Sequence, residues 1–314
     1  MNGVLVLLGI SAAVLASCSS GGSNSQPPAT LETSVEAPQT SGQAERGLEL
    51  RVLTVDDSGN RVAKALARFQ DSESGIEAED RAVWDQWGLR WIAVPVDQLD
   101  AITNSQQMVQ AMQNRWMGEL PRWRPIIRTG ELRNDPVRIG DAASSSLNSI
   151  EGRPRLLVRA WTTPELTAAG ALARLHVDLA VQLTKPQSRS SVWQPAEIPS
   201  VLSEGDLISE LRTTKVLDGS TALVLVGVDP SDQWIQDETD GSVAVRTTAQ
   251  SSRGPDTPLP RTLGQRMLST PGTGSVAPGA RYVAPKKVLI VLIPKTGGPY
   301  QLLGTPASGS GTQP

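Results

Sequence analysis

Hydrophobic and polar residues alternate most regularly between positions 175 and 183. The odd-numbered positions of this stretch are all Leu or Val, whereas the even-numbered positions are His176, Asp178, Ala180 and Gln182. A period of two is typical of a β-strand that buries one face. The pattern therefore predicts a strand with an apolar face and a more polar face.

Other apolar segments of the second half have strand length, at residues 155–161, 212–217, 220–228 and 287–293. The Thr162-Thr163-Pro164 sequence is expected to end the first of these segments, and Pro294 the last. Asp218-Gly219 favours a type I′ turn, which predicts that the strands on either side of it pair. We therefore expect an antiparallel β-meander over residues 151–304. It is interrupted by a Gly/Pro-rich loop or disordered insertion at about 254–285 and followed by a disordered tail, 305–314.

The first half has mixed periodicity. Residues 48–55 alternate as a half-buried strand, and residues 77–87 carry apolar side chains on one helical face, with Gly88 placed to end that helix. A strand at 89–96 and a short helix at 96–102 are expected to follow. Residues 47–150 thus predict a small mixed α/β domain, and the whole chain an α+β fold.

The N-terminus begins with an apolar run, residues 4–15, that is much shorter than the roughly 20 residues of a membrane-spanning helix. It ends in Leu15-Ala16-Ser17-Cys18, which resembles the lipobox of bacterial lipoproteins. The resemblance implies a signal peptide at 1–17 and a diacylated Cys18 that holds the mature protein to membrane lipid. One departure is that Met1-Asn2-Gly3 lacks a basic residue. A conventional secretory signal with an incidental Cys18 is the alternative.

The residues that follow favour the lipoprotein interpretation. Residues 18–46 are rich in Ser, Gly, Pro and Gln, a composition that cannot bury a core and that suits a flexible tether. Ser19, where some lipoproteins carry Asp, implies sorting to the outer membrane by analogy with that family. We expect a lipid-anchored protein that faces the periplasm.

Composition and charge narrow the range of protein classes and partners. The 314 residues are 39% hydrophobic and carry a net charge of -3, which indicates a globular protein and argues against a nucleic-acid partner bound by bulk charge. The sole cysteine leaves no intramolecular disulfide.

Catalytic chemistry has little support. His176 is the only histidine, and it lies on the polar side of a predicted strand. No nucleophile elbow, phosphate loop or dinucleotide motif occurs. The acidic residues around Trp234 do not have the spacing of a calcium loop, so a solvated loop is favoured. We therefore expect no enzymatic activity, no cofactor and no metal site.

The eight tryptophans are the remaining candidates for recognition. Trp84, Trp87 and Trp91 have helix-face spacing and are expected in the core. Trp116 and Trp123 stand among arginines and prolines, and are the candidate ligand-binding residues for a protein or glycan partner.

The order of strands in the second half resembles the C-terminal β-region of bacterial secretins. The resemblance rests on residues 157–161 and 175–183, on the sequence from Lys215 to Thr221 around the Asp-Gly pair, and on residues 288–294. It departs from that family at Gly227-Val228, where a Gly-Gly-Leu sequence is usual. It implies a component of an outer-membrane complex.

Four functions stay open from the sequence. The first is an envelope lipoprotein with a structural or protein-binding role, and the second is a glycan-binding lipoprotein whose partner could be peptidoglycan. The third is an unrecognised enzyme whose catalytic groups would have to be Asp, Glu, Lys, Arg or Ser, and the fourth is the secretin-like component.

Overall fold

The protein is mainly β. The structure, a computed structural model, describes residues 46–297 with gaps at 71, 73–75, 105–108, 142–143, 169, 186–199, 237–242, 248–258 and 271–284. Of the described residues, 63% lie in strands and 19% in helices. The α+β class expected from the sequence is therefore wrong, because two antiparallel sheets form the body and the helices are few and short.

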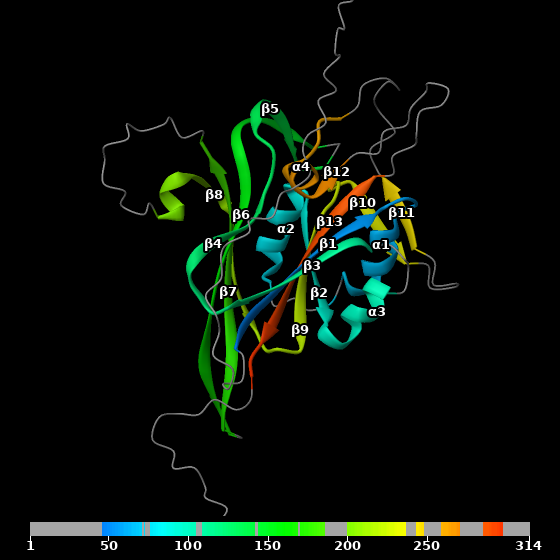
Figure 1. Ribbon diagram of the computed structural model, residues 1–314. Helices are drawn as coiled ribbons and strands as arrows, with labels where there is room; N and C mark the ends of the chain where they lie inside the picture. Colours follow the sequence, from blue (N-terminus) through cyan, green and yellow to red (C-terminus); the bar gives the residue numbers. More distant parts are fainter. Residues whose placement is uncertain are drawn as a thin grey trace, which may run out of the picture.

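The first sheet combines strands from both ends of the chain (Figure 1). Its order is β2-β9-β13-β1-β3, with the short β12 also paired to β13. The strands are β1 (Gly47–Asp56), β2 (Leu89–Pro95), β3 (Val109–Gly118), β9 (Thr221–Gly227), β12 (Ser269–Thr270) and β13 (Lys286–Lys295). β1 and β13 pair along their whole length, from Gly47 opposite Lys295 to Asp56 opposite Lys286.

The second sheet comes from the middle of the chain. Its order is β4-β6-β7-β8, and β5 pairs with the part of β6 that extends beyond β4. The strands are β4 (Leu120–Arg128), β5 (Leu132–Ile139), β6 (Ser146–Thr167), β7 (Gly170–Thr184) and β8 (Gly205–Leu217). A separate hairpin consists of β10 (Asp232–Gln236) and β11 (Val243–Thr247).

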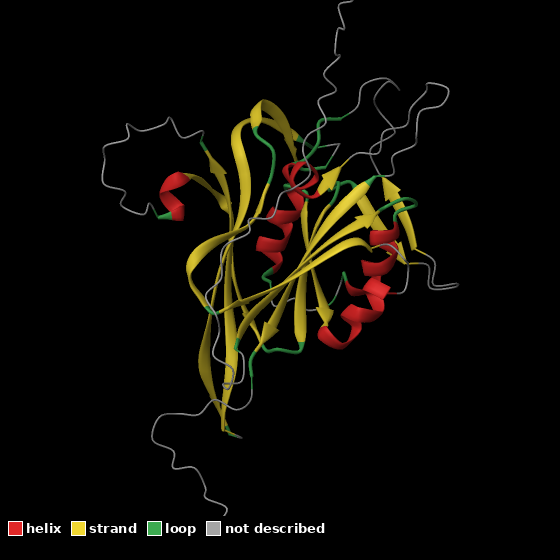
Figure 2. Cartoon of the chain, viewed as in Figure 1, coloured by secondary structure: helices red, strands yellow, loops and turns green. Residues whose placement is uncertain are grey.

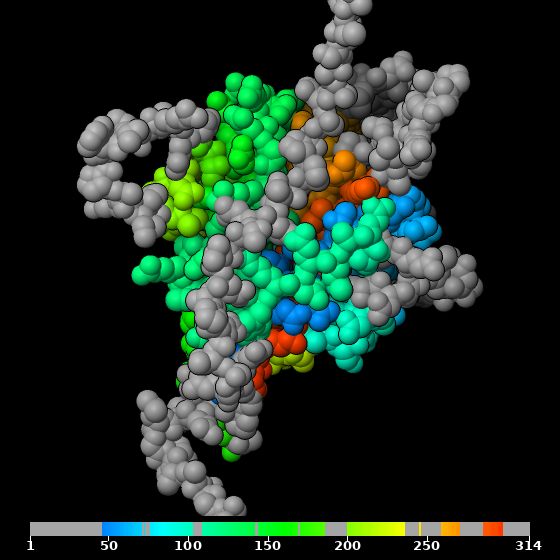
Figure 3. Space-filling view, viewed as in Figure 1, coloured from blue at the N-terminus to red at the C-terminus, as the bar shows by residue number. Residues whose placement is uncertain are grey.

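The helices are short and fall into two groups (Figure 2). α1 (Arg61–Leu66), η1 (Ala67–Phe69), η2 (Val96–Gln98) and α3 (Leu99–Asn104) lie on the side of the first sheet that faces away from the second sheet. α2 (Ala78–Gln86) and α4 (Leu263–Leu268) contribute to the core between the two sheets. η3 (Val201–Glu204) precedes β8. The space-filling view shows the green second-sheet strands along one side of the body, with β1 and β13 reaching the surface beside the teal-green β3 (Figure 3).

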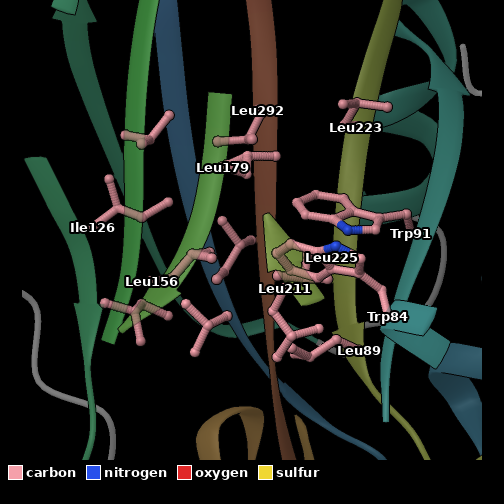
Figure 4. Packing of buried hydrophobic residues seen from close by; sticks show 14 of the residues in the cluster. Trp84, Leu89, Trp91, Ile126, Leu156, Leu179, Leu211, Leu223, Leu225 and Leu292 are labelled. Atoms are coloured by element: carbon pink, nitrogen blue, oxygen red, sulfur yellow. The ribbon is translucent and has the colours of Figure 1, made fainter. Parts of the chain in front are cut away.

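The central strands of the first sheet are covered on both faces, whereas the edge strand β3 is exposed over residues 110–114. One face packs against the second sheet, where Trp91 and Leu225 lie opposite side chains such as Leu156 and Leu179 (Figure 4). The other face packs against α1, η1, α3 and the β10–β11 hairpin. The strand expected at residues 48–55 buries apolar side chains on both faces and not on one, because Leu53 and Val55 face the core beneath α1, η1 and α3, whereas Glu49 and Arg51 stay partly exposed.

Several local predictions are confirmed. The alternating segment 175–183 lies within β7, and the predicted helix and strand at 77–96 are α2 and β2. Gly88 follows α2 with a φ of 77°, the left-handed conformation expected of a residue that ends a helix. The helix expected at 96–102 is split into η2 and α3.

Two predictions about the second half are wrong. The strands on either side of Asp218-Gly219 do not pair with each other, because β8 joins β7 in the second sheet whereas β9 lies between β2 and β13 in the first. The expected meander is thus a crossing from one sheet to the other. The second wrong prediction concerns β6, which was expected to end at Thr162-Thr163-Pro164. It continues past Pro164 to Thr167. There β6 pairs with β7 alone, because its register with β4 ends at Ala160, and a strand tolerates proline at such an edge position.

The Gly/Pro-rich stretch contains an ordered element. Residues 259–270 are described, and they include α4 and β12. Thr262 caps α4 through its side chain, which accepts a hydrogen bond from the backbone N–H of Gln265, while the Gln265 side chain accepts one from the backbone N–H of Thr262. This reciprocal capping box explains why a six-residue helix begins here.

Candidate functional site

The predicted lipidation site, Cys18, lies outside the described residues, so its acylation stays a prediction. The described chain starts at Arg46, immediately before β1. Among the helices that the structure describes, none has the length and apolar character needed to cross a bilayer.

The first three tryptophans are core residues, as predicted. Trp84 and Trp91 are fully buried with their ring centroids 5.3 Å apart, and Trp87 is nearly so. Figure 4 shows the Trp84 and Trp91 rings side by side between the sheets. Because their surfaces are taken up by packing, they are not available to a partner.

Trp116 lies near the end of β3, on the first sheet, and is half-buried. It pairs in register with Glu49 and, with Arg115 and Lys295, lines an open pocket of about 510 Å³. Burial opposes the ionisation of Glu49, but hydrogen bonds and charge attraction from Arg51 and Lys295 outweigh that effect and lower its pKa. The pocket therefore combines one aromatic ring with a carboxylate held in its charged form.

Trp123 lies on β4, in the second sheet, among different neighbours from Trp116. The Cζ atom of Arg159 stands 5.1 Å from the centroid of the Trp123 ring and also 5.1 Å from that of Trp161. The ring of Trp161 stacks on His176 with a centroid distance of 5.4 Å and an interplanar angle of 11°. We call the four residues Trp123, Arg159, Trp161 and His176 the outer-face ladder.

The ladder lies on the face of the second sheet that points away from the core. Along β6 and β7 the neighbouring positions, such as Val158, Ala160 and Val177, face the inter-sheet core, so Arg159, Trp161 and His176 emerge on the other side. Trp123, Trp161 and His176 are half-buried. The ladder thus spans β4, β6 and β7 and keeps part of its surface open.

Buried polar contacts hold the ladder in place. The Nε atom of Arg159 donates to Asp178 at 2.5 Å, and the hydroxyl of Thr214 donates to the other oxygen of that carboxylate at 2.7 Å. Asp178 is only 2% exposed. The Nε2 atom of His176 is hydrogen-bonded to the hydroxyl of Thr163 at 2.8 Å. The guanidinium and the imidazole are therefore both fixed by neighbouring side chains.

This arrangement supplies aromatic rings, a rigid guanidinium and an imidazole on one surface. Such groups bind partners by ring stacking and cation–π contact. The sequence indicated Trp123 but not its neighbours in the ladder. The available signal was that His176 falls on the polar side of one predicted strand, and that Arg159 and Trp161 alternate with Val158 and Ala160 in another. Recognising the cluster also required the register that sets Trp161 opposite His176.

Within the described ranges, no group of three His, Cys, Asp or Glu side chains is arranged to hold a metal ion. Three residues of the acidic segment, Asp237, Glu238 and Asp240, lie outside those ranges. Asp229, which is described, accepts a hydrogen bond from the buried Arg138.

Comparison with known proteins found no matching family model, no matching curated protein and no matching solved structure. The segments that carry the secretin-like order divide between the two sheets. β6, β7 and β8 belong to the second sheet, and β9 and β13 to the first.

Proposed function

We propose that this protein is a lipid-anchored lipoprotein of the outer membrane whose folded body binds a protein partner in the periplasm through the outer-face ladder. The observation that carries the proposal is the position of Arg159, whose guanidinium lies 5.1 Å from the ring centroids of both Trp123 and Trp161 on a partly open sheet face. The anchor is supported by the Leu15-Ala16-Ser17-Cys18 sequence and by the polar tether behind it.

The composition of the ladder favours a protein partner. Trp and Arg are the residue types most enriched among the few side chains that dominate protein–protein binding energies. Two half-buried indole rings with a guanidinium between them place these types side by side.

The rigidity of the ladder favours binding as well. A surface arginine ordinarily loses side-chain freedom when it binds, at a cost of roughly 0.5–1.5 kcal/mol. Arg159 is already held by Asp178 and by two rings, so most of that ordering is complete before a partner arrives.

An apolar neighbour extends the surface. Val216 on β8 pairs in register with His176 and is 51% exposed. With Val216 included, the candidate contact surface has residues from all four strands of the β4-β6-β7-β8 order. A central aromatic cluster with an apolar rim residue is consistent with a small interface.

The test is chemical cross-linking of the anchored protein in membranes, followed by purification and identification of the attached proteins. Trp161→Ala is expected to remove a partner that the unchanged protein captures, because truncation of such a residue weakens binding by about 2 kcal/mol or more, roughly 30-fold. Trp116→Ala, at a half-buried tryptophan of the first sheet, is the matched control and should retain the partner. Equal capture by both variants would contradict the proposal.

The anchor is tested separately. Cys18→Ala is expected to leave the chain unprocessed or soluble in the periplasm, since no thiol remains for acylation. Membrane fractionation and intact-mass measurement report the result. A variant that stayed in membranes with the mass and detergent partitioning of the unchanged protein would rule out lipidation at Cys18.

Glycan binding is the second candidate. It is favoured by Trp116, whose pocket of about 510 Å³ has the size of a small-ligand site and includes charged groups beside the ring. Sedimentation with purified peptidoglycan separates the two functions. Glycan binding predicts cosedimentation that Trp116→Ala abolishes, whereas protein binding predicts none. The secretin-like alternative rests on the order of sequence motifs alone.

A further inference from the structure

A polar pocket of about 470 Å³ lies on the second sheet, apart from the ladder residues. Its walls come from the end of β4 at Arg128, from Arg153 and Arg155 on β6, from the end of β7 and from Glu204 in η3. Each of its lining residues is polar or charged. Its volume lies in the range of about 300–1,000 Å³ that is typical of small-molecule sites.

The lining carries an excess of positive charge. Four of its side chains are cationic and two are carboxylates, so their formal charges leave an excess of two positive charges. The cations are Arg128, Arg153, Arg155 and Lys185, and the carboxylates are Glu131 and Glu204. Positive groups gathered in a concave site attract anions more strongly than the same groups on a flat surface.

Arg155 forms the fixed part of this site. It is 1% exposed and donates to the side-chain oxygen of Gln182 at 2.8 Å from Nε and 2.6 Å from Nη2. Its Nη1 donates to Glu204 at 2.6 Å, and Nη2 donates to the carbonyl of Val201 at 2.7 Å. The Glu204 carboxylate is therefore already paired with Arg155, and its negative charge does little to neutralise the positive charges of the other three cations.

Two cations at the mouth are better placed to meet a ligand. Arg153 is exposed and forms no ion pair with any residue that the structure describes. Lys185 pairs with Asp206 at 2.7 Å, but the two side chains are 70% and 71% exposed. An ion pair so open to water is weak and can exchange for a bound anion.

We propose that this pocket binds a phosphate monoester. A phosphate dianion matches the excess of two positive charges, whereas a carboxylate supplies one negative charge. Arginine side chains bind phosphate oxygens through paired N–H donors. The volume leaves room for the organic group of the ester as well as the phosphate. A soluble ester and the headgroup of a phosphate-bearing lipid both present this chemistry.

The experiment is titration calorimetry at low salt with the full-length protein in detergent. Glycerol phosphate represents the soluble source, and dihexanoyl phosphatidic acid, kept below its micelle concentration, presents the same phosphate group on a lipid. Saturable binding of glycerol phosphate at least as tight as that of the lipid indicates a soluble ligand. Binding of the lipid that is tenfold tighter or more indicates a lipid headgroup. Either result supports the site, and absence of binding by both would overturn it.

Variants locate the binding. Arg153→Gln is expected to weaken binding about tenfold, the loss of one charge-assisted hydrogen bond. Arg212→Gln is the matched control, because Arg212 is an exposed arginine of the same sheet, on β8, and does not line the pocket. Equal weakening by the two variants, or acetate binding as tight as glycerol phosphate, would overturn the assignment. Arg153 is an exposed strand residue, so circular dichroism should show an intact fold in its variant.

Discussion

The contact between the end of α2 and the start of α4 depends on two glycines. A Cβ atom on Gly88 would overlap the side chain of Thr262 and lie 2.7 Å from the carbonyl oxygen of Val228. Gly88 also has a φ of 77°, which a residue with a side chain adopts at a cost. Gly88→Ala therefore introduces backbone strain and steric overlap together.

Two other glycines separate these contributions. Gly59 has a φ of 69°, and a Cβ atom added to it would have no neighbouring atom within 4 Å, so Gly59→Ala introduces the backbone strain alone, roughly 1–2 kcal/mol. On Gly264, which lies inside α4, an added Cβ would overlap the carbonyl group of Gly88 and lie 2.9 Å from the backbone nitrogen of Leu89. Gly264→Ala thus introduces the overlap alone, about 1–3 kcal/mol. For Gly88→Ala the two effects together give about 2–5 kcal/mol.

The assay is equilibrium unfolding in urea, followed by tryptophan fluorescence, which the neighbouring Trp84 and Trp87 make sensitive to this region. A domain is stable by about 5–15 kcal/mol, so the loss in Gly88→Ala is a large fraction of the total. We expect its unfolding midpoint to fall by roughly 1 M or more. Gly88→Ala and Gly264→Ala are both expected to lose more stability than Gly59→Ala, which introduces no overlap. A midpoint for Gly88→Ala within error of that for Gly59→Ala would refute the claim of close contact.

Two further predictions concern buried polar groups. Thr262→Ala should lower the free energy of unfolding by about 1–3 kcal/mol, because it removes the cap of α4 and a hydrogen bond to the Val228 carbonyl. The control variant Thr262→Ser keeps the hydroxyl and should have nearly the free energy of unfolding of the unchanged protein in the same urea assay. Burial lowers the pKa of Lys215 below its usual 10.5, against the opposing charges of Asp80 and Glu77. The unfolded chain therefore binds more protons between the two pKa values, and this group makes stability rise with pH across that window. Lys215→Met should flatten that rise and raise the midpoint at pH 7, and an unchanged slope would show that the group is not desolvated.

The sequence predicted many elements because their signals are local. The alternation from Leu175 to Leu183 marks β7, and Gly88 marks the end of α2, without reference to the rest of the chain. The Asp218-Gly219 pair likewise marks a turn. A turn dipeptide does not determine which strand lies beside the next segment, however, and here β9 is taken up between β2 and β13. The meander prediction was wrong for this reason, since the sheet to which a strand belongs depends on distant partners.

The prediction of the candidate site from the sequence was limited in the same way. Trp123 was identified from the composition of its neighbours, but the ladder exists because β4, β6 and β7 bring Trp123, Arg159 and His176 across three strands. The even-numbered side of β7 looked solvent-facing because it carries His176, Asp178 and Gln182. Asp178 and Gln182 are in fact buried, because each is paired with an arginine of β6. Polar patterning cannot distinguish a hydrated residue from one that is buried and paired.

The pairing of β1 with β13 has a consequence for biogenesis. A chain synthesised from its N-terminus contains β1 long before it contains β13, yet β13 and β3 are the two strands between which β1 lies. Until residues 286–295 are available, one edge of β1 has no partner, and its apolar residues lack the neighbours that β13 supplies. Folding that depends on such distant contacts is slow, and unpaired apolar strands aggregate. The first sheet therefore closes only after residues 286–295 are available, and until then β1 keeps one unpaired edge.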